Sequence, residues 1–140
     1  MIKVILADPE KEIFNAEVKS VNIKTNDGEI GVFAGHEPLM STISYGEVVI
    51  EKENENKIIT REVFSAYNGV VNIENEKGKT KVIILVESVE NIKDIDEKSL
   101  EEAIERAKIA NSEKSNETFD LEIGMLRDMS RLKLARKYKV

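Results

Sequence analysis

The sequence contains no cysteine, no tryptophan, one histidine and two prolines among its 140 residues. Without cysteine, neither disulfide bonds nor thiolate chemistry can support the fold or its function. A single histidine excludes zinc sites built on a histidine pair, and sites with cysteine ligands are excluded as well. The chain is therefore poorly supplied with the side chains that catalysis commonly uses, and its length suits one domain or two small ones.

Long apolar runs are also missing. The apolar run 82–86 is bounded by Lys81 and Glu87, and nothing approaches the roughly 20 apolar residues of a membrane-spanning helix. The first ten residues carry acidic side chains instead of a basic region and an apolar core, so we expect no secretion signal there. Acidic residues outnumber basic ones by 27 to 21, which gives a net charge of −6 and argues against a general nucleic-acid binder.

Residues 1–86 show the pattern of short β-strands. Ile2, Val4 and Leu6 alternate with other residues, and β-branched residues dominate the later runs. Turn-forming residues separate the runs at a spacing of roughly 8–12 residues, which is typical of an antiparallel sandwich or barrel. The predicted turns are Asp8-Pro9, 26–28, Gly46, 53–56, Asn68-Gly69 and 77–78, of which Asn68-Gly69 is the strongest because both residues tolerate positive φ. We predict an all-β domain over residues 1–86.

After Glu87 the apolar spacing changes from two residues to about 3.6, the period of an α-helix. The polar segment 111–116 contains poor helix formers and is predicted to be a turn. The first helix would begin at Asp94 or Asp96 as N-cap, or at a capping box on Ser99. The apolar positions of the first helix are Leu100, Ala103, Ile104, Ala107 and Ala110, and those of the second are Leu121, Met125, Met129, Leu132 and Ala135. We predict an α+β chain in which an antiparallel two-helix hairpin, with helices of about 14–17 residues, occupies residues 87–140.

The apolar stripe of the first helix is more than half alanine. Alanine buries little area, and isolated helices of this length are marginally stable in water. The hairpin could therefore detach from the β domain and extend, or it could form a fixed helical cap. The residues favour neither reading.

Charge is unevenly distributed along the predicted hairpin. Residues 87–105 hold eight acidic and two basic side chains, whereas residues 127–140 hold six basic and one acidic. The two helices could simply attract each other, at about 0.2–1 kcal/mol per exposed pair, or the basic end could dock on an acidic protein surface. We name this end the basic tail, and its candidate residues are Arg127, Arg131, Lys133, Arg136 and Lys137.

The most distinctive segment is GEIGVFAGHEPLM, residues 28–40. Its glycines permit sharp bends around a short apolar strand. No Lys-Ser or Lys-Thr pair and no helix follow them, so this is not a phosphate-binding loop. His36 lies next to Glu37, but adjacent residues of an extended chain point to opposite faces, which suits them badly for paired acid–base catalysis.

This segment resembles the signature of the epsilon subunit of F-type ATP synthases. Segments 2–9, 14–21, 41–48 and 67–73 resemble further parts of that family in order and length, and Ala34 stands where the family commonly has proline. The resemblance implies a sandwich of about ten strands followed by two antiparallel helices. It also implies a non-catalytic central-stalk subunit that couples the catalytic head to the ion-translocating rotor ring and restrains ATP hydrolysis through its hairpin.

The resemblance further implies partners and contact residues. The partners would be the gamma subunit, the c subunits of the rotor ring and the alpha/beta catalytic head, with the protein held peripherally at the cytoplasmic face of a bacterial membrane. Glu29, Ile30 and Gly31 would lie on a loop that faces the rotor ring. The contact with the gamma subunit, at the end of the sandwich, would involve His36, Pro38, Leu39 and Met40.

Some members of the family bind ATP through an Ile/Leu-Asp-x-x-Arg-Ala motif and arginines of the second helix. Here Asp96 is present, but Ser99 and Leu100 replace the Arg-Ala pair. Arginine offers phosphate a fixed set of donors that serine does not provide. Arg127 and Arg131 would be the remaining contributors, and the interpretation that we favour for Asp96 is a helix N-cap. We therefore expect no bound cofactor and no metal.

Two other classes of function remain as alternatives. A free-standing β-sandwich adaptor could dock an acidic protein partner through the basic tail. A small-molecule binding module or enzyme would need a polar cluster in a pocket, and the sequence offers none beyond surface charge.

Overall fold

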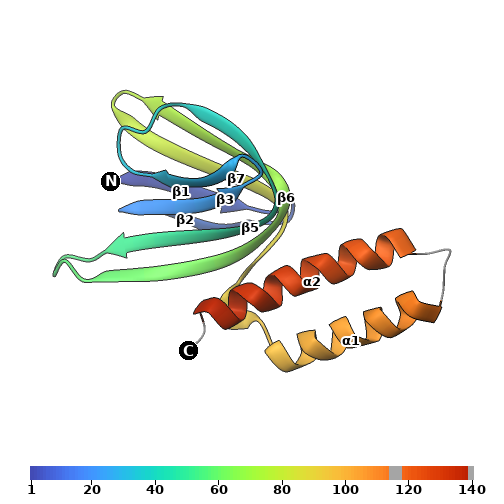
Figure 1. Ribbon diagram of the computed structural model, residues 1–140. Coiled ribbons are helices and arrows are strands. Elements are labelled where there is room, and N and C mark those ends of the chain that lie inside the picture. The colour runs from blue at the N-terminus through green and yellow to red at the C-terminus, as the bar shows by residue number, and fades with distance from the viewer. Residues whose placement is uncertain (114–117, 139–140) are drawn as a thin grey trace. The chain divides into compact units, whose positions relative to one another are not determined.

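The computed structural model describes residues 1–113 and 118–138, and the side chains of 111–113 and 118–123 are outside the described set. The chain divides into two separately packed units, Met1–Glu90 and Asn91–Val140. The first consists of β-strands and the second of helices (Figure 1).

The first unit is one seven-stranded sheet that folds over a single core. The strand order is β2-β1-β7-β6-β5-β3-β4, with β1 parallel to β7, and antiparallel pairs β1–β2, β3–β4, β3–β5 and β5–β6. The strands are β1 (Ile2–Ala7), β2 (Glu12–Val18), β3 (Ser20–Thr25), β4 (Gly28–Val32), β5 (Leu39–Glu53), β6 (Ile59–Glu76) and β7 (Lys79–Asn91).

The core follows from the period-two alternation. Ile2, Val4 and Leu6 are completely buried, as the alternation in β1 predicts. Burying an aliphatic side chain of this size stabilises the fold by about 1.5–3 kcal/mol. Each of the seven strands contributes to the core: Ile2, Val4, Leu6, Val18, Val21, Ile23, Val32, Ile43, Val48, Ile50, Phe64, Ala66, Val71, Ile73, Val82, Ile84 and Val86.

The predicted sandwich class is confirmed, but the strands number seven instead of about ten. Gly46 and Asn68-Gly69, which we predicted to be turns, lie inside β5 and β6. Those two turn predictions were wrong. Figure 1 shows β5 and β6 as long, strongly curved strands, and each runs where the sequence suggested two shorter ones.

A change in the alternation marks where these two strands bend. In β5 the core-facing positions pass from Ile43 to Val48, an odd number of residues. In β6 they pass from Ala66 to Val71, again an odd number. Because side chains alternate between faces, an odd step means that the face turned toward the core changes at this point of each strand, while the β5–β6 register stays continuous from Ile43↔Gly69 to Tyr45↔Tyr67.

The glycines lie at these bends because another strand passes very close. A Cβ at Gly69 would lie 2.1 Å from the carbonyl oxygen of Leu85, and one at Gly46 would lie 2.7 Å from that of Lys24. Next to Gly69, Asn68 has φ +52°, a conformation that asparagine tolerates better than most residues. The same residue types that form tight turns thus form strand bends here.

Other features of the predicted β domain are confirmed. Turns occupy 26–27, 55–56 and 77–78, and β2 and β3 are separated at Lys19, where the alternation slips. β7 extends beyond Val86, the predicted domain boundary, to Asn91.

The second unit contains a short 3₁₀ helix, η1 (Ile92–Asp94), followed by α1 (Glu97–Glu113) and α2 (Thr118–Tyr138). Asp96 caps α1: its carboxylate accepts from the backbone N–H groups of Lys98 (3.1 Å) and Ser99 (3.3 Å). The Ser99 hydroxyl donates to the same carboxylate, so Ser99 is not itself the cap. The predicted turn at 111–116 begins too early, because α1 continues to Glu113, and the rest of that segment, 114–116, lies outside the described residues.

The two helices run antiparallel (Figure 1). Met129, placed on the apolar stripe by its spacing, is 43% exposed, whereas the unpredicted Leu134 is buried. The side chain of Leu121 is outside the described set. Within the described residues no helix has the length and apolar character needed to cross a membrane. The described apolar residues buried in this unit are Ile92, Ile95, Leu100, Ile104, Leu132, Leu134 and Ala135.

Candidate interaction surface

The residues predicted to face a rotor ring lie on strand β4, at one edge of the sheet, and not on a loop. Glu29 is exposed and pairs in register with Lys24 of β3. Ile30 is half-buried against the core, and Gly31 is exposed. The predicted loop was wrong because 28–32 completes a β-hairpin with β3 around the turn at 26–27.

The turn of this hairpin is bonded to the beginning of β5. The backbone N–H of Asn26 donates to the carbonyl of Thr42 (2.9 Å), and the Asn26 side chain donates to the Thr42 hydroxyl (2.8 Å). The Ser41 hydroxyl donates to Asp27 at 2.6 Å. These bonds fix the position of the β3–β4 turn relative to β5.

The connection from β4 to β5, residues 33–38, begins with a turn. The N–H of His36 donates to the carbonyl of Phe33 (3.2 Å), and Gly35 has φ +87° at the third position. A positive φ there is the feature that defines a type II turn and favours glycine. Ala34 occupies the second position, where proline is common in such turns.

The β6–β7 hairpin holds this loop through its backbone. The N–H of Gly35 donates to the Thr80 hydroxyl (2.8 Å), and that hydroxyl donates to the side-chain oxygen of Asn75 (2.8 Å). The Asn75 amide in turn donates to the carbonyl of His36 (2.6 Å). Thr80 is only 2% exposed, so these bonds are shielded from water at one end.

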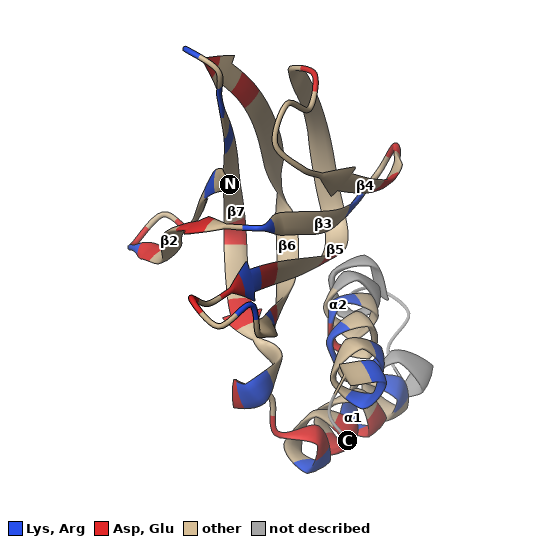
Figure 2. Ribbon diagram, turned by 90° about the vertical axis from the view of Figure 1, so that its left-hand side faces the viewer, with Lys and Arg blue, Asp and Glu red and all other residues tan. Residues whose placement is uncertain are grey.

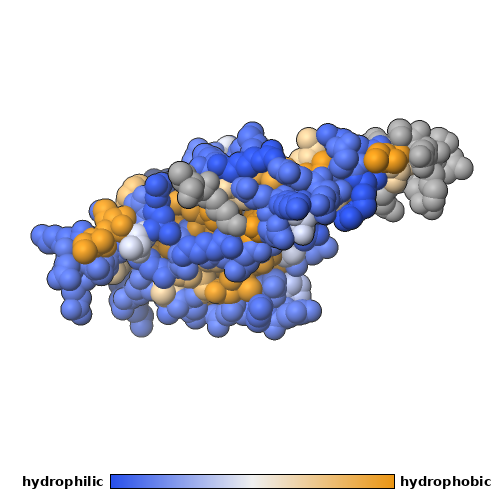
Figure 3. All heavy atoms as spheres, turned by 90° about the horizontal axis from the view of Figure 1, so that it is seen from below, coloured by the Kyte–Doolittle hydropathy of each residue, from blue (hydrophilic) through white to orange (hydrophobic). Residues whose placement is uncertain are grey.

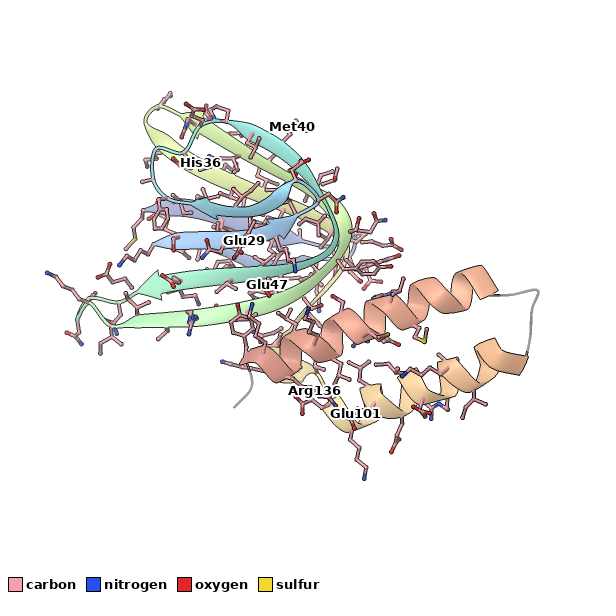
Figure 4. The ribbon with its side chains drawn as sticks, viewed as in Figure 1. Glu29, His36, Met40, Glu47, Glu101 and Arg136 are labelled. Atoms are coloured by element: carbon pink, nitrogen blue, oxygen red, sulfur yellow. The ribbon has the colours of Figure 1, made fainter. Side chains whose placement is uncertain are left out.

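Beside this loop the sandwich presents apolar side chains to solvent. Phe33 is 57% exposed and Met40 is 71% exposed. Pro38, Leu39 and Met40 line an open groove of about 560 Å³ together with residues 72–76 of β6. In Figure 4, His36 and Met40 are labelled in the upper part of the first unit. Exposed apolar groups that gather around a groove are typical of a binding surface.

A second exposed apolar pair lies at the tip of the β5–β6 hairpin. Ile58 is 56% and Ile59 is 47% exposed. In Figure 3 the hydrophobic (orange) spheres at the far left belong to this tip, among hydrophilic neighbours. Charged residues of both signs surround the pair along the sequence, so nothing there favours one kind of partner.

The basic tail is bound partly within the helical unit. Arg136 forms an ion pair with Glu101 of α1, and Arg131 forms one with Asp128 on its own helix (2.9 Å). The Lys137 ammonium lies over the ring of Tyr138, 5.1 Å from its centre. Figure 2 shows basic residues along α2 and acidic ones at the beginning of α1. The Arg136–Glu101 pair supports the reading in which the two helices attract each other.

The remaining tail residues and the expected ATP-site residues are placed as follows. Lys133 is exposed, and Arg127 is half-buried on α2. Asp96 uses its carboxylate to cap α1, as we expected. Among the described residues no three His, Asp or Glu side chains are grouped so that they could hold a metal ion. The expectation that no ATP is bound stays a prediction.

Residues 1–92 match the family model for the "ATP synthase, Delta/Epsilon chain, beta-sandwich domain". The chain belongs to this family. The match covers the whole sheet unit, and it confirms the resemblance found in residues 28–40. The family places the chain among the accessory, non-catalytic subunits of the F-type ATP synthase.

Curated relatives carry the same description. The chain is 29% identical over 106 residues to the ATP synthase epsilon chain of Anoxybacillus flavithermus, covering 76% of this chain and 72% of the relative. It is 30% identical over 105 residues to that of Desulforudis audaxviator, covering 75% and 70%. A third match, 40% identical over 58 residues to the epsilon chain of Aliarcobacter butzleri, covers 41% of this chain and under half of the relative (46%).

Two solved structures share the fold. A chain in the mitochondrial ATP synthase of Euglena gracilis (OSCP/F1/c-ring) superposes with a TM-score of 0.76 at 23% identity, covering 98% of this chain and 81% of that one. A chain in the central stalk/c-ring structure from Tetrahymena thermophila gives 0.54 at 16% identity, covering 99% and 96%. At these identities the likeness concerns the fold alone.

Sequence reasoning missed the residues that hold the loop 33–38. Thr80 and Asn75 read in the sequence as ordinary polar positions of a strand and its end. Only the folded chain shows that they meet Gly35 and His36, about 40 positions earlier. Phe33 lies within the motif, but nothing in its spacing marks it as exposed.

Proposed function

We propose that the chain is a central-stalk subunit of an F-type ATP synthase whose sheet unit couples the catalytic head to the ion-translocating rotor ring. The family match over residues 1–92 supports this role for the first unit. The two structures of the same fold support it further, since one comes from an OSCP/F1/c-ring assembly and the other from a central stalk with a c-ring.

Two surfaces of the first unit would meet these partners. Glu29, Ile30 and Gly31 on edge strand β4 would face the rotor ring, at the cytoplasmic side of the membrane. The surface formed by His36, Pro38, Leu39 and Met40 would contact the gamma subunit. The assignment to the gamma subunit depends on the exposure of Met40. Its side chain is 71% exposed beside the open groove, in a unit whose other apolar side chains are mostly buried.

Cross-linking tests the assignment of β4. The chain has no native cysteine, so Glu29→Cys introduces the only thiol. We expect it to cross-link to a cysteine placed in the polar loop of the ring subunit in the assembled enzyme. Glu55→Cys, in the exposed turn between β5 and β6, is the matched control and should give no such product. Cross-linking of Glu29→Cys to the catalytic head alone would refute the assignment.

We also propose that the helical unit restrains ATP hydrolysis through its basic tail. The support is the excess of basic residues from Arg127 onward and the exposure of Lys133, Arg136 and Lys137. Each exposed pair with an acidic surface of the head would contribute about 0.2–1 kcal/mol. Several pairs together would reach about 1.4 kcal/mol, which is a tenfold change in the population of the bound hairpin.

A charge-neutral tail tests this role. Replacing Arg127, Arg131, Lys133, Arg136 and Lys137 by glutamine should raise the rate of ATP hydrolysis of the purified head with this chain bound. It should also flatten the salt dependence of that rate, since salt screens exposed charges. The control replaces five exposed lysines elsewhere by glutamine: Lys3, Lys11, Lys57, Lys93 and Lys98.

The Arg136–Glu101 pair requires one more variant. Glu101→Gln breaks the same ion pair but leaves the tail charge intact. It should leave hydrolysis near the parent rate. If Glu101→Gln raises hydrolysis as much as the neutral tail does, the effect comes from loosening the helix pair and not from binding to the head. A neutral tail that hydrolyses ATP at the parent rate at every salt concentration would refute the inhibitory role.

A further inference from the structure

We propose that Thr80 and Asn75 are positioning residues that set the loop 33–38 in the conformation that the gamma subunit binds. We name the four residues of this hydrogen-bonded chain, Gly35, His36, Asn75 and Thr80, the loop clamp. The proposal rests on the function proposed above, because it assigns the residues that position one of its two contact surfaces.

The clamp is a closed path of directed hydrogen bonds. It runs from the Gly35 N–H to the Thr80 hydroxyl, then to the Asn75 side-chain oxygen, and from the Asn75 amide back to the His36 carbonyl. The three donor–acceptor distances are 2.8, 2.8 and 2.6 Å. Thr80 both accepts and donates, so removing its hydroxyl breaks two bonds at once. Consecutive bonds of this kind polarise and strengthen one another.

The clamp holds the loop only by backbone atoms of Gly35 and His36. The side chains of the loop therefore do not take part in holding it, and Phe33 remains 57% exposed. The His36 ring is oriented by a contact of its Nδ1 with the Glu37 carbonyl oxygen (2.6 Å). Figure 4 shows His36 on this loop. A loop fixed in this way loses less conformational entropy when a partner binds, which strengthens binding without adding a contact.

The burial of Thr80 distinguishes the clamp from an ordinary surface contact. At 2% exposure its hydroxyl has no access to bulk water as an alternative partner, so the bond to Gly35 persists in the free protein. Ala34 makes this support more important: it stands at the turn position where proline would fix φ and stiffen the loop. The β6–β7 hairpin supplies here the rigidity that the loop sequence lacks.

Thr80→Val tests the proposal, because valine keeps the shape and removes both hydrogen bonds. We expect the Gly35 amide to exchange with deuterium faster than in the parent and the affinity of the full chain for isolated gamma subunit to fall about three- to tenfold. Thr80→Ser is the matched control: it keeps the hydroxyl and should retain both the protection and the affinity. Hydrogen exchange of the β1 amides reports whether the sheet itself is intact.

Asn75→Asp gives a second test on an exposed residue, where folding is not at risk. Aspartate can still accept from Thr80 but cannot donate to the His36 carbonyl, so the affinity should fall by a similar factor. Met40→Ala removes a proposed contact side chain and separates the two hypotheses. If Met40→Ala weakens binding while Thr80→Val and Asn75→Asp do not, the clamp proposal is refuted and the contact surface stands. If none of the three changes the affinity, the contact surface is misplaced and the clamp proposal falls with it.

Discussion

The sheet unit and the helical unit of this chain differ strongly in how much apolar surface each buries in its own interior. Seventeen buried side chains from seven strands form the core of the sheet unit, and most have no exposed surface. The described part of the helical unit buries seven apolar residues, one of them an alanine, and leaves Ile109, Leu126 and Met129 about half exposed. At about 1.5–3 kcal/mol for each large buried side chain, the difference far exceeds what exposed ion pairs can offset.

This difference fits a division of labour. A unit that positions fixed contact surfaces needs a single rigid structure, which a dense core and bonded loops provide. A unit that acts as a regulator needs a second accessible state, and weakly packed segments change state at low cost. Each of the following predictions perturbs one unit and uses the other as its reference.

The largest effect is expected from truncating the sheet core. Ile84 is completely buried, so Ile84→Ala should destabilise the sheet unit by about 2–5 kcal/mol through lost burial and an unfilled cavity. Ile104→Ala is the corresponding change in α1, where the side chain is 6% exposed. Denaturant unfolding should be followed in a Tyr138→Phe background, in which the remaining tyrosines, Tyr45 and Tyr67, both lie in the sheet unit and report on it by near-UV circular dichroism. The far-UV signal of the helices reports on the helical unit.

We expect Ile84→Ala to shift the tyrosine transition and Ile104→Ala to shift only the helical one. Coincident shifts of both signals in both variants would show that the two units unfold as one cooperative body, contrary to the comparison drawn above.

A methyl group added at a glycine should have opposite effects in the two units. In Gly69→Ala the new Cβ would overlap the Leu85 carbonyl oxygen and the Val86 backbone, which no rotamer change relieves, at a cost of about 3 kcal/mol. In α2 nothing lies within 4 Å of a Cβ at Gly124, so Gly124→Ala should stabilise the helix by about 0.5–1 kcal/mol. Thermal unfolding of both variants measures these changes. A Gly69→Ala variant as stable as the parent would mean that β6 and β7 are not this close.

The order of elements and the position of the core were predictable because alternation and helical spacing encode them directly. We did not recognise the bends in β5 and β6 from the sequence. Ile43 and Val48 already stand an odd number of positions apart in the sequence, which breaks the period-two alternation of a single straight strand. Asparagine and glycine favour the same backbone conformations in a hairpin turn and in a bent strand. Only the close passage of β7 against Gly69 decides between them, and that contact lies far along the chain.

The candidate surface was predictable only in part. The motif at residues 28–40 located the edge strand and the loop through family resemblance. It could not reveal the bond between Gly35 and Thr80, which joins residues 45 positions apart, because no local pattern records such a pairing. Met129 was misplaced on α2 since regular spacing alone does not fix how a helix is rotated about its axis.

The smallest effect is expected at the ion pair between the two helices. Glu101 and Arg136 are about half exposed, so their interaction should contribute only about 0.2–1 kcal/mol. A double-mutant cycle of Glu101→Gln and Arg136→Gln, read from the helical unfolding signal, measures this coupling. The coupling energy should decrease as salt is added. Neither substitution should shift the tyrosine transition of the sheet unit. A coupling of several kcal/mol would make the helix pair far more rigid than its packing indicates.

The most direct test of the central claim is a fragment that ends with β7 at Asn91 and lacks the helical unit. The account predicts that residues 1–91 unfold cooperatively in denaturant with the tyrosine transition of the full chain, and bind isolated gamma subunit with the affinity of the full chain. A fragment that is unfolded, or folded but unable to bind, would contradict the claim that the sheet unit by itself forms the stalk-binding part of the protein.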